Sequence, residues 1–224
     1  MEFQKLLLSQ DGSHTIYSEK YDAHYHSIYG AIDESIHVFI SAGLYHKWRQ
    51  GDRSVTIFEM GFGTGLNAYL SYLEGIKLGM DIHYITVESD PVSSQDAEKL
   101  NYHKLVGKDN NDVFLRMHSA EWNKEVAISK NFFLAKHNVN VQELSIHPVV
   151  DIIYYDAFAP TCQPELWEVP LHQKLYNSLK LKGIIVTYCA QGQFKRNLKS
   201  VGYKLELLNG PHKKREMVRG LKKA

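Results

Sequence analysis

Short apolar runs alternate with longer amphipathic stretches along most of the chain. The apolar runs predict strands, and the stretches in which apolar residues recur at the helical period predict helices. Strands that alternate with helices indicate a doubly wound α/β fold, in which helices cover both faces of a mostly parallel sheet. The expected strands cover residues 55–60, 83–87, 132–135, 149–155 and 183–189, and the expected helices cover residues 66–78, 93–105, 167–179 and 193–201.

Both ends of the chain depart from this alternation. Residues 203–208 and 216–221 have strand character and are joined through Asn209-Gly210-Pro211, a turn sequence. We therefore expect an antiparallel hairpin at one edge of the sheet. Residues 1–50, which are rich in Tyr and His, precede the first expected strand, so we expect them to form a cap or lid on a single domain of residues 51–224.

Composition narrows the class of protein. With 44% hydrophobic and 23% charged residues, the chain is expected to be globular. It has no apolar run of the roughly 18 residues that a membrane span needs, and its N-terminus lacks a secretory signal pattern. We therefore expect a cytoplasmic protein without a membrane partner. Cys162 and Cys189 lack the spacing of a zinc or redox pair, and the histidines form no ligand-spaced cluster, so we expect no metal.

Charge is unevenly distributed along the chain. The formal net charge is +1, yet residues 195–224 hold ten Lys and Arg against Glu206 and Glu216, which leaves +8 there and −7 elsewhere. Such a segment is typical of a surface that binds a polyanion. A solvated basic face would produce the same pattern.

A glycine-rich turn follows the first expected strand. It reads Glu59-Met60-Gly61-Phe62-Gly63-Thr64-Gly65 and opens a helix, where glycines allow the backbone to approach a ligand closely or simply to pack. A dinucleotide-binding GxGxxG pattern would need glycine at position 66, where the chain has Leu66. The observed ExGxGxG spacing is instead familiar from Rossmann-like methyltransferases.

Two acids at strand ends suit S-adenosylmethionine, the cofactor of such methyltransferases. Glu59 can bond the amino group of the methionine part of S-adenosylmethionine, directly or through water. Glu88, at the end of the second expected strand, can bridge ribose hydroxyls. An acceptor at Glu88 suits NAD as well, and an exposed acid at a strand end would look the same in the sequence.

The fourth expected strand ends at Asp156, which is followed by Ala157-Phe158-Ala159-Pro160. Ligands of open α/β sheets bind outside the carboxyl ends of strands, so Asp156 should face the glycine turn, near the methyl group to be transferred. An amine acceptor arrives protonated at neutral pH. Asp156 could take that proton, or hold the amine while water takes it. The other interpretation is that Asp156 caps the next helix.

Four ordered motifs resemble those of the MnmC methyltransferase family, which completes 5-methylaminomethyl-2-thiouridine at the tRNA wobble position. Residues 58–67 are similar to its cofactor turn, and Asp156-Ala157-Phe158-Ala159-Pro160 with Pro164-Glu165-Leu166-Trp167 is similar to its D-x-F-A-P…N-P-[DE]-x-W stretch. The entry segment and the K-R-E-M ending of the family are matched by Asp22, Tyr25, Ser27, Glu34, Ser35, Val38 and Phe39, and by Lys213-Lys214-Arg215-Glu216-Met217.

The resemblance implies a Rossmann-like S-adenosylmethionine methyltransferase fold and methylation of the exocyclic amine of 5-aminomethyl-(2-thio)uridine in the anticodon loop of tRNA. It implies that Asp156 accepts the proton, that Phe158 and Pro160 line the pocket of the flipped-out uridine, and that Lys213, Lys214 and Arg215 contact phosphates. The cofactor-binding positions that it implies are Tyr25, Glu59, Gly61, Gly63, Gly65, Asn67, Glu88 and Asn140.

The chain departs from the family pattern in three ways. Fused members carry a flavin-dependent oxidoreductase domain, for which 224 residues leave no room, so we expect no flavin and a separate enzyme that supplies the aminomethyl precursor. Asn140 stands where the family often has Asp near the adenine, and its amide oxygen can accept the same hydrogen bond. Gln163 stands where the family usually has Asn before the proline, which bears on the acceptor rather than the cofactor.

Two other functions fit part of the pattern. A polyamine aminopropyltransferase shares the fold, but it needs several acids around the acceptor, and the segment after Asp156 offers only Ala, Phe and Pro. A non-catalytic RNA-binding subunit would be expected to lose the turn glycines or the strand-end acids, which are all present. The cofactor residues alone do not identify the acceptor, so small-molecule and protein substrates also fit them. The sequence predicts no oligomeric state.

Overall fold

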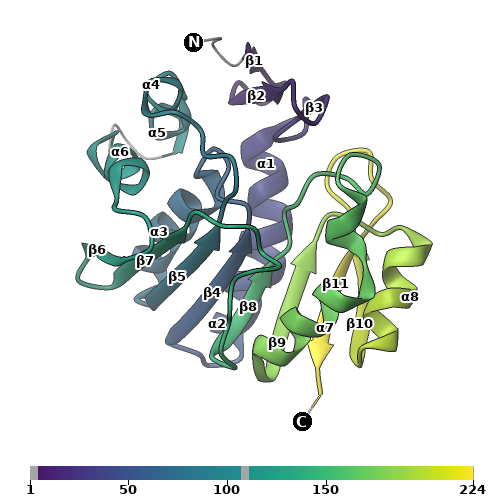
Figure 1. Cartoon of the computed structure of the whole chain (residues 1–224). Coiled ribbons are helices and arrows are strands. Elements are labelled where there is room, and N and C mark those ends of the chain that lie inside the picture. The colour runs from purple at the N-terminus through teal and green to yellow at the C-terminus, as the bar shows by residue number, and fades with distance from the viewer. Residues whose placement is uncertain (1–4, 107–110, 224) are drawn as a thin grey trace.

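The computed structural model describes residues 5–106 and 111–223. Eight strands form the central sheet: β4 (Ser54–Met60), β5 (Asp81–Val87), β6 (Glu125–Ser129), β7 (Phe132–His137), β8 (Val150–Tyr154), β9 (Leu179–Thr187), β10 (Tyr203–Asn209) and β11 (Glu216–Lys222). Their order is β10-β11-β9-β8-β4-β5-β7-β6 (Figure 1). The five central strands are parallel, whereas β11 runs antiparallel to β9 and β10, and β6 runs antiparallel to β7.

Helices cover both faces of this sheet and bury two separate cores. A continuous helical run of α1 (Ala31–Ser35), η1 (Ile36–Leu44, a π-helix) and α2 (Tyr45–Arg49) shares one core with α3 (Leu66–Leu78) and α6 (Asn111–Ser119). The other core lies under α7 (Val169–Ser178) and α8 (Gly192–Ser200), which η2 (Pro164–Trp167) precedes. Successive strand residues point to opposite faces, so Ile57 enters the first core and Phe58 the second. In the described part of the chain, no helix combines the length and apolar composition that a membrane span requires.

The prediction of a doubly wound, mostly parallel α/β sheet with an antiparallel C-terminal hairpin is confirmed. The strand order reverses at β4, which pairs with β5 on one side and with β8 on the other. In this fold class the reversal leaves a crevice at the carboxyl ends of the two diverging strands, where ligands bind.

Residues 5–24 form a second, smaller sheet of β1 (Lys5–Leu8), β2 (His14–Ser18) and β3 (Ala23–His24), at the top of Figure 1. It is attached to α5 (Tyr102–Val106) and the residue before it. The His14 amide donates to Asn101 Oδ1 over 2.8 Å, and the Tyr102 hydroxyl donates to the His14 carbonyl over 2.7 Å. The first 50 residues therefore contain two structures, this small sheet and the helical run that packs on the main sheet.

One predicted helix is wrong in detail. Instead of one helix over residues 93–105, the chain forms α4 (Ser94–Ala97) and α5. The break has a tertiary cause, because the Asn101 side chain accepts from the His14 amide and donates to the Gly12 carbonyl over 2.8 Å. An Asn side chain that bonds distant backbone in this way competes with the helix. Edge strand β6 and helix α6 were not predicted.

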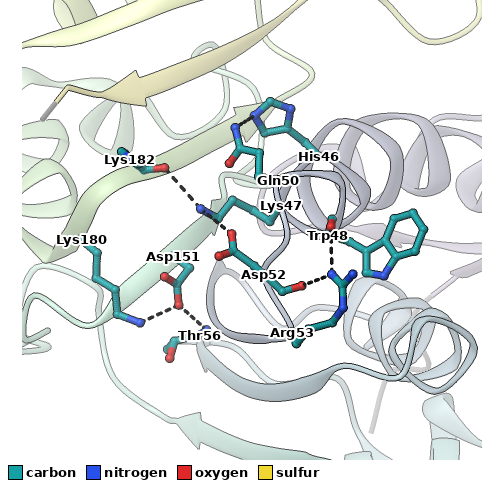
Figure 2. Close-up of polar contacts among 10 residues, drawn as sticks. All are labelled: His46, Lys47, Trp48, Gln50, Asp52, Arg53, Thr56, Asp151, Lys180 and Lys182. Atoms are coloured by element: carbon teal, nitrogen blue, oxygen red, sulfur yellow. Dashed lines mark hydrogen bonds and ion pairs between the residues drawn. The ribbon is translucent and has the colours of Figure 1, made fainter.

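At the amino ends of the strands, Figure 2 shows two separate groups of polar contacts, one that joins α2 to β9 through Lys47 and the Lys182 carbonyl and one that joins β4, β8 and β9 through Asp151. The Lys47 side chain is 7% exposed and pairs with Asp52 over 2.8 Å. Asp151 accepts from the Thr56 amide and from Lys180 Nζ, each over 2.8 Å. The pairing of β8 with β9 shifts register between Val150 and Ile152, which lets residues around Lys180 leave the ladder and reach these partners.

Candidate functional site

A cavity of about 570 Å³ lies at the carboxyl ends of β4, β5 and β8, where the strand order reverses. Its volume is within the usual range for a cofactor site. Of the residues that the sequence singled out, nine lie on its wall: Tyr25, Glu59, Gly61, Gly63, Asn67, Glu88, Asn140, Asp156 and Phe158. Gly65, Pro160, Lys213, Lys214 and Arg215 lie outside it.

The three glycines of the turn have positive φ angles of 85° at Gly61, 50° at Gly63 and 72° at Gly65, which favour glycine. A Cβ on Gly61 would meet nothing nearer than Glu88 Oε2 at 3.9 Å, so the backbone here faces open cavity. A Cβ on Gly63 would meet the Tyr25 ring at 3.0 Å. Gly65 instead begins α3 and is packed against His118. The turn thus exposes its backbone to a ligand at Gly61 and closes against Tyr25 at Gly63.

Glu59 is 1% exposed, lies in β4 and lines the cavity. Its Oε2 atom has no hydrogen-bond partner among the described residues. Burial raises the pKa of this carboxyl well above its usual value, and the nearby Asp156 carboxylate adds to the shift. A buried acceptor without a partner suits a ligand with a cationic N–H donor, such as the amino group of a methionine.

Glu88 follows β5 and is fixed by two backbone amides. Its Oε2 accepts from the Gly63 amide over 3.0 Å, and its Oε1 accepts from the Asp90 amide over 2.8 Å. Burial raises the pKa of Glu88. Asn140 lies farther along the wall, and its Nδ2 donates to Glu143 over 3.1 Å, so the other polar atom of its amide is an acceptor. These positions suit a ribose and an adenine, respectively.

Asp156 follows β8 and accepts a hydrogen bond from Asn67 Nδ2 over 2.7 Å. Its pKa is raised to about 7; burial is the largest cause, and the charge of Glu34 contributes to the same rise. The Asn67 hydrogen bond and the charge of Lys214 act in the opposite direction. A carboxyl group with this pKa exchanges its proton near neutrality, which suits a general base.

Aromatic side chains form the side of the cavity next to Asp156. The Phe158 ring lies 4.7 Å from the Tyr21 ring and 5.1 Å from the Tyr25 ring, centroid to centroid. Trp167 Nε1 donates to the Phe158 carbonyl over 2.9 Å and fixes the loop after β8. In the sequence, Tyr21 is only one of several aromatic residues of the N-terminal segment. Nothing in its sequence context distinguishes it from Tyr17 or Tyr29.

A second, open hollow of about 440 Å³ lies beyond the loop after β8. Pro160, Lys214 and Arg215 are on its wall, together with Tyr188 and Gln191. Lys213 lies over the Tyr29 ring, 4.7 Å from its centroid. Of the predicted acceptor and phosphate contacts, Phe158 thus lines the main cavity, whereas Pro160, Lys214 and Arg215 line the second hollow.

Glu34 is a site residue that sequence reasoning missed. It is 9% exposed in α1, pairs with Lys214 Nζ over 2.6 Å, and its charge acts on Asp156. The motif that contains Glu34 is visible in the sequence, but 122 positions separate it from Asp156, and only the fold brings the two charges together. Among the described residues, His, Cys, Asp and Glu form no group of three that could hold a metal ion.

Comparisons with known proteins agree with this geometry. Residues 107–223 match the family model of an S-adenosyl-L-methionine-dependent methyltransferase. The tRNA 5-methylaminomethyl-2-thiouridine biosynthesis bifunctional protein MnmC of Leptospira borgpetersenii is 29% identical over 235 residues, which cover 96% of this chain and 34% of the relative. The protein of the same name from Actinobacillus pleuropneumoniae is 27% identical over 96% of this chain and 35% of its own length. The chain thus spans about a third of these relatives.

Solved structures share the fold. The crystal structure of MnmC2 from Aquifex aeolicus superposes with a TM-score of 0.77 at 20% identity and covers 100% of this chain and 72% of that one. A Listeria monocytogenes protein described as a class I S-adenosylmethionine-dependent methyltransferase gives a TM-score of 0.51 at 18% identity, over 92% of this chain and 62% of that one. Aminopropyl transfer and a non-catalytic role are not favoured. The chain belongs to the family of S-adenosyl-L-methionine-dependent methyltransferases, and within it the chain is MnmC-like.

Proposed function

We propose that this methyltransferase acts on a primary amine of a tRNA nucleoside, the exocyclic amine of 5-aminomethyl-(2-thio)uridine at the wobble position. The observation that carries the proposal is the position of Asp156, between the cofactor cavity and an aromatic wall, with a pKa of about 7. The MnmC relatives support this proposal, because they are named for the biosynthesis of 5-methylaminomethyl-2-thiouridine in tRNA, the product that this methylation would give. A general base that titrates near neutrality suits an acceptor that must lose a proton before it attacks.

The cavity residues divide between the two substrates. Glu59 and the Gly61 backbone would hold the methionine part of the cofactor, Glu88 the ribose, and Asn140 the adenine. S-adenosylmethionine supplies an electrophilic methyl group. Phe158 on the cavity wall and Pro160 on the wall of the second hollow would hold the uridine ring so that its amine is aligned with that group, which is most of what an in-line displacement requires. Tyr25, assigned to the cofactor, packs against Phe158. Asp156 would first take the proton of the ammonium form of the amine, directly or through water. The N–C bond would then form as the bond from the methyl carbon to the sulfonium sulfur breaks, which leaves a neutral thioether and a secondary ammonium product.

The basic loop supports a nucleic acid substrate. Lys213 and Arg215 are exposed between β10 and β11, on the same side of Asp156 as the second hollow. Phosphates neutralised there would position an anticodon loop while the aromatic wall receives the base. We further propose that the small sheet of residues 5–24 serves as the cap of the cavity, that the protein works with cytoplasmic tRNA, and that a separate enzyme supplies the aminomethyl precursor.

The test uses purified protein, S-adenosylmethionine labelled in its methyl group, and bulk tRNA from cells that cannot complete the wobble modification. After digestion, we expect the label in 5-methylaminomethyl-2-thiouridine. Asp156→Asn is the matched variant, because it keeps the shape of the side chain and removes the base. We expect it to lose at least 100-fold in methyl transfer, roughly what a general base contributes, with cofactor affinity retained. Cofactor binding without any labelled nucleoside would reject the proposed substrate and leave the family assignment intact.

A further inference from the structure

Two charged side chains from opposite ends of the sequence meet beside the reacting carboxyl group. Glu34 of α1 accepts a hydrogen bond from Lys214 Nζ over 2.6 Å through Oε1, and from the Ser27 amide over 3.2 Å through Oε2. The Glu34 side chain is 12% exposed and that of Lys214 is 42% exposed. Lys214 Nζ also lies over the Tyr188 ring, 4.1 Å from its centroid. The position of the ammonium group is therefore set by one carboxylate and one aromatic face.

This pair is coupled to Asp156 through the loop that follows β8. The Tyr188 hydroxyl donates over 2.7 Å to the carbonyl of Ala157, the residue next to Asp156. The charge of Glu34 raises the pKa of Asp156, and the charge of Lys214 lowers it. The side-chain amide of Asn67, from α3, also lowers the pKa of Asp156 through its hydrogen bond. The nearby Glu59 carboxyl, from β4, is a group whose own pKa Asp156 raises.

We propose that Glu34 and Lys214 are a pair of positioning residues, which hold a balanced charge beside Asp156 and thereby keep the acceptor amine uncharged when it meets the methyl group. The inference rests on the proposed function, because it assigns a role in methylation of an amine. It concerns residues that act through Asp156 rather than on the substrate directly.

The physical argument is one of charge balance. A primary amine attacks only in its neutral form, and every unpaired carboxylate near it stabilises the ammonium form instead. Asp156 must be near the amine to receive its proton. An uncompensated Glu34 charge would therefore favour the protonated form of Asp156 and the ammonium form of the amine, neither of which can react. Lys214 cancels that charge. A nearby cation is also a known way to depress the pKa of an amine.

Substitutions of the two residues should shift the pH dependence of the rate in opposite directions. Lys214→Met leaves Glu34 uncompensated, so the midpoint of the acid limb of the rate against pH should move up, by roughly one pH unit. Glu34→Gln leaves Lys214 uncompensated, so the midpoint should move down by a similar amount. The double variant should return close to the wild-type midpoint. Lys214→Arg keeps the charge and should keep the midpoint.

Lys213→Met is the matched control. It removes a neighbouring lysine of the same loop, which lies over Tyr29 rather than beside Glu34. If tRNA binding were the role of Lys214, both lysine variants would raise the KM for tRNA and leave the pH midpoint in place. Opposite midpoint shifts in Lys214→Met and Glu34→Gln support the inference, and shifts in the same direction or no shift overturn it.

A second readout does not depend on the substrate. The carboxyl carbon of Asp156 can be followed by NMR in protein labelled at aspartate, with Asp156→Asn used to assign the signal. Its titration midpoint should rise in Lys214→Met, fall in Glu34→Gln and return in the double variant. If the wild-type protein methylates no nucleoside while these midpoints shift as expected, the proposed substrate is rejected, and the effect of Glu34 and Lys214 on Asp156 is supported. If methylation occurs and the midpoints do not move, the proposed role of Glu34 and Lys214 is rejected and the proposed substrate is retained.

Discussion

The side-chain amide of Asn67, in the first turn of α3, donates a hydrogen bond to Oδ2 of Asp156, at the end of β8, over 2.7 Å. This contact joins the helix that follows the glycine turn to the loop that follows β8. The glycine turn and Asp156, the proposed base, are thus linked through one hydrogen bond.

Asn67→Ala should therefore change the pH dependence of methyl transfer. The hydrogen bond from Asn67 lowers the pKa of Asp156, which is about 7, so its loss raises that pKa. More Asp156 is then protonated at pH 7, and we expect the rate to fall roughly 10-fold, with the acid limb moved to higher pH. The rate is measured from pH 6 to pH 9 with saturating cofactor.

Ser71→Ala is the control for that experiment. Ser71 lies one turn further along α3 and is fully buried, but its hydroxyl donates to the Tyr154 hydroxyl over 3.3 Å rather than to Asp156. It should alter stability without moving the acid limb. An unchanged limb in Asn67→Ala would show that the hydrogen bond does not govern Asp156.

Cofactor binding should release a proton. Burial raises the pKa of Glu59 well above its usual value, and a bound ammonium group would lower that pKa because it favours the ionised carboxylate. Affinity for S-adenosylmethionine should accordingly increase with pH. Calorimetry in two buffers with different enthalpies of ionisation measures the protons released.

Glu59→Gln separates this effect from general loss of affinity. The amide keeps the shape of the side chain but cannot release a proton, so the buffer dependence should largely disappear along with part of the affinity. Equal proton release by wild type and Glu59→Gln would assign the proton to another group.

The dependence of tRNA binding on salt should report the basic loop. Removing one phosphate-binding side chain lowers the slope of log affinity against log salt by about 1. We expect that decrease for Arg215→Gln and for Lys213→Gln, measured by filter binding at several salt concentrations. Lys124→Gln, on the exposed turn before β6, should leave the slope unchanged. A slope that no loop variant alters would remove the loop from the tRNA-binding surface.

Lys136 should make stability increase with pH in alkaline solution. It is fully buried in β7, donates to the His118 carbonyl over 2.6 Å and lies over the Trp122 ring. Burial lowers its pKa from 10.5 to about 8. Between these values the unfolded chain binds more protons than the folded protein, so the free energy of unfolding rises with pH and the contribution is lost as pH falls through 8.

The variant Lys136→Met lacks this titration. Its free energy of unfolding relative to wild type should therefore decrease between pH 7 and pH 10, as measured by urea denaturation of both proteins. The comparison cancels the titration of the buried tyrosines, which both proteins share. A constant difference across that range would mean that Lys136 remains charged in the folded protein.

The sequence predicted the parts of the fold that depend on a local pattern. The strand around Ile57 and Phe58 is apolar on both faces, and α3 begins after the positive φ of Gly65 and ends at Gly79, a glycine in the left-handed conformation. Both signals lie within a few residues of the element that they define. That Glu59, Gly61 and Glu88 lie together on the cavity wall could be predicted for the same reason, since they lie at or directly after the ends of such strands; their contacts with a cofactor stay a prediction.

What the sequence left undetermined depends on distant partners. The helix break before Tyr102 exists because Asn101 bonds residues 12 and 14. In edge strand β6 the apolar Ala127 is exposed like Glu125, so the sequence lacks the clear alternation of apolar and polar residues that predicts a strand. Glu34 became a site residue only when the hairpin loop brought Lys214 to it. None of these contacts leaves a periodic signal in the chain.

The attachment of the small sheet also has a kinetic consequence. Tyr21 and Tyr25 line the cavity but belong to a segment whose link to α5 includes the Asn101 and Tyr102 hydrogen bonds rather than the ladder of the main sheet. Such a segment can open while the rest of the protein stays folded. Its amide protons should exchange faster than those of β4, and slow down when cofactor binds. Asn101, which lies outside the cavity, would thus influence how long the cofactor remains bound.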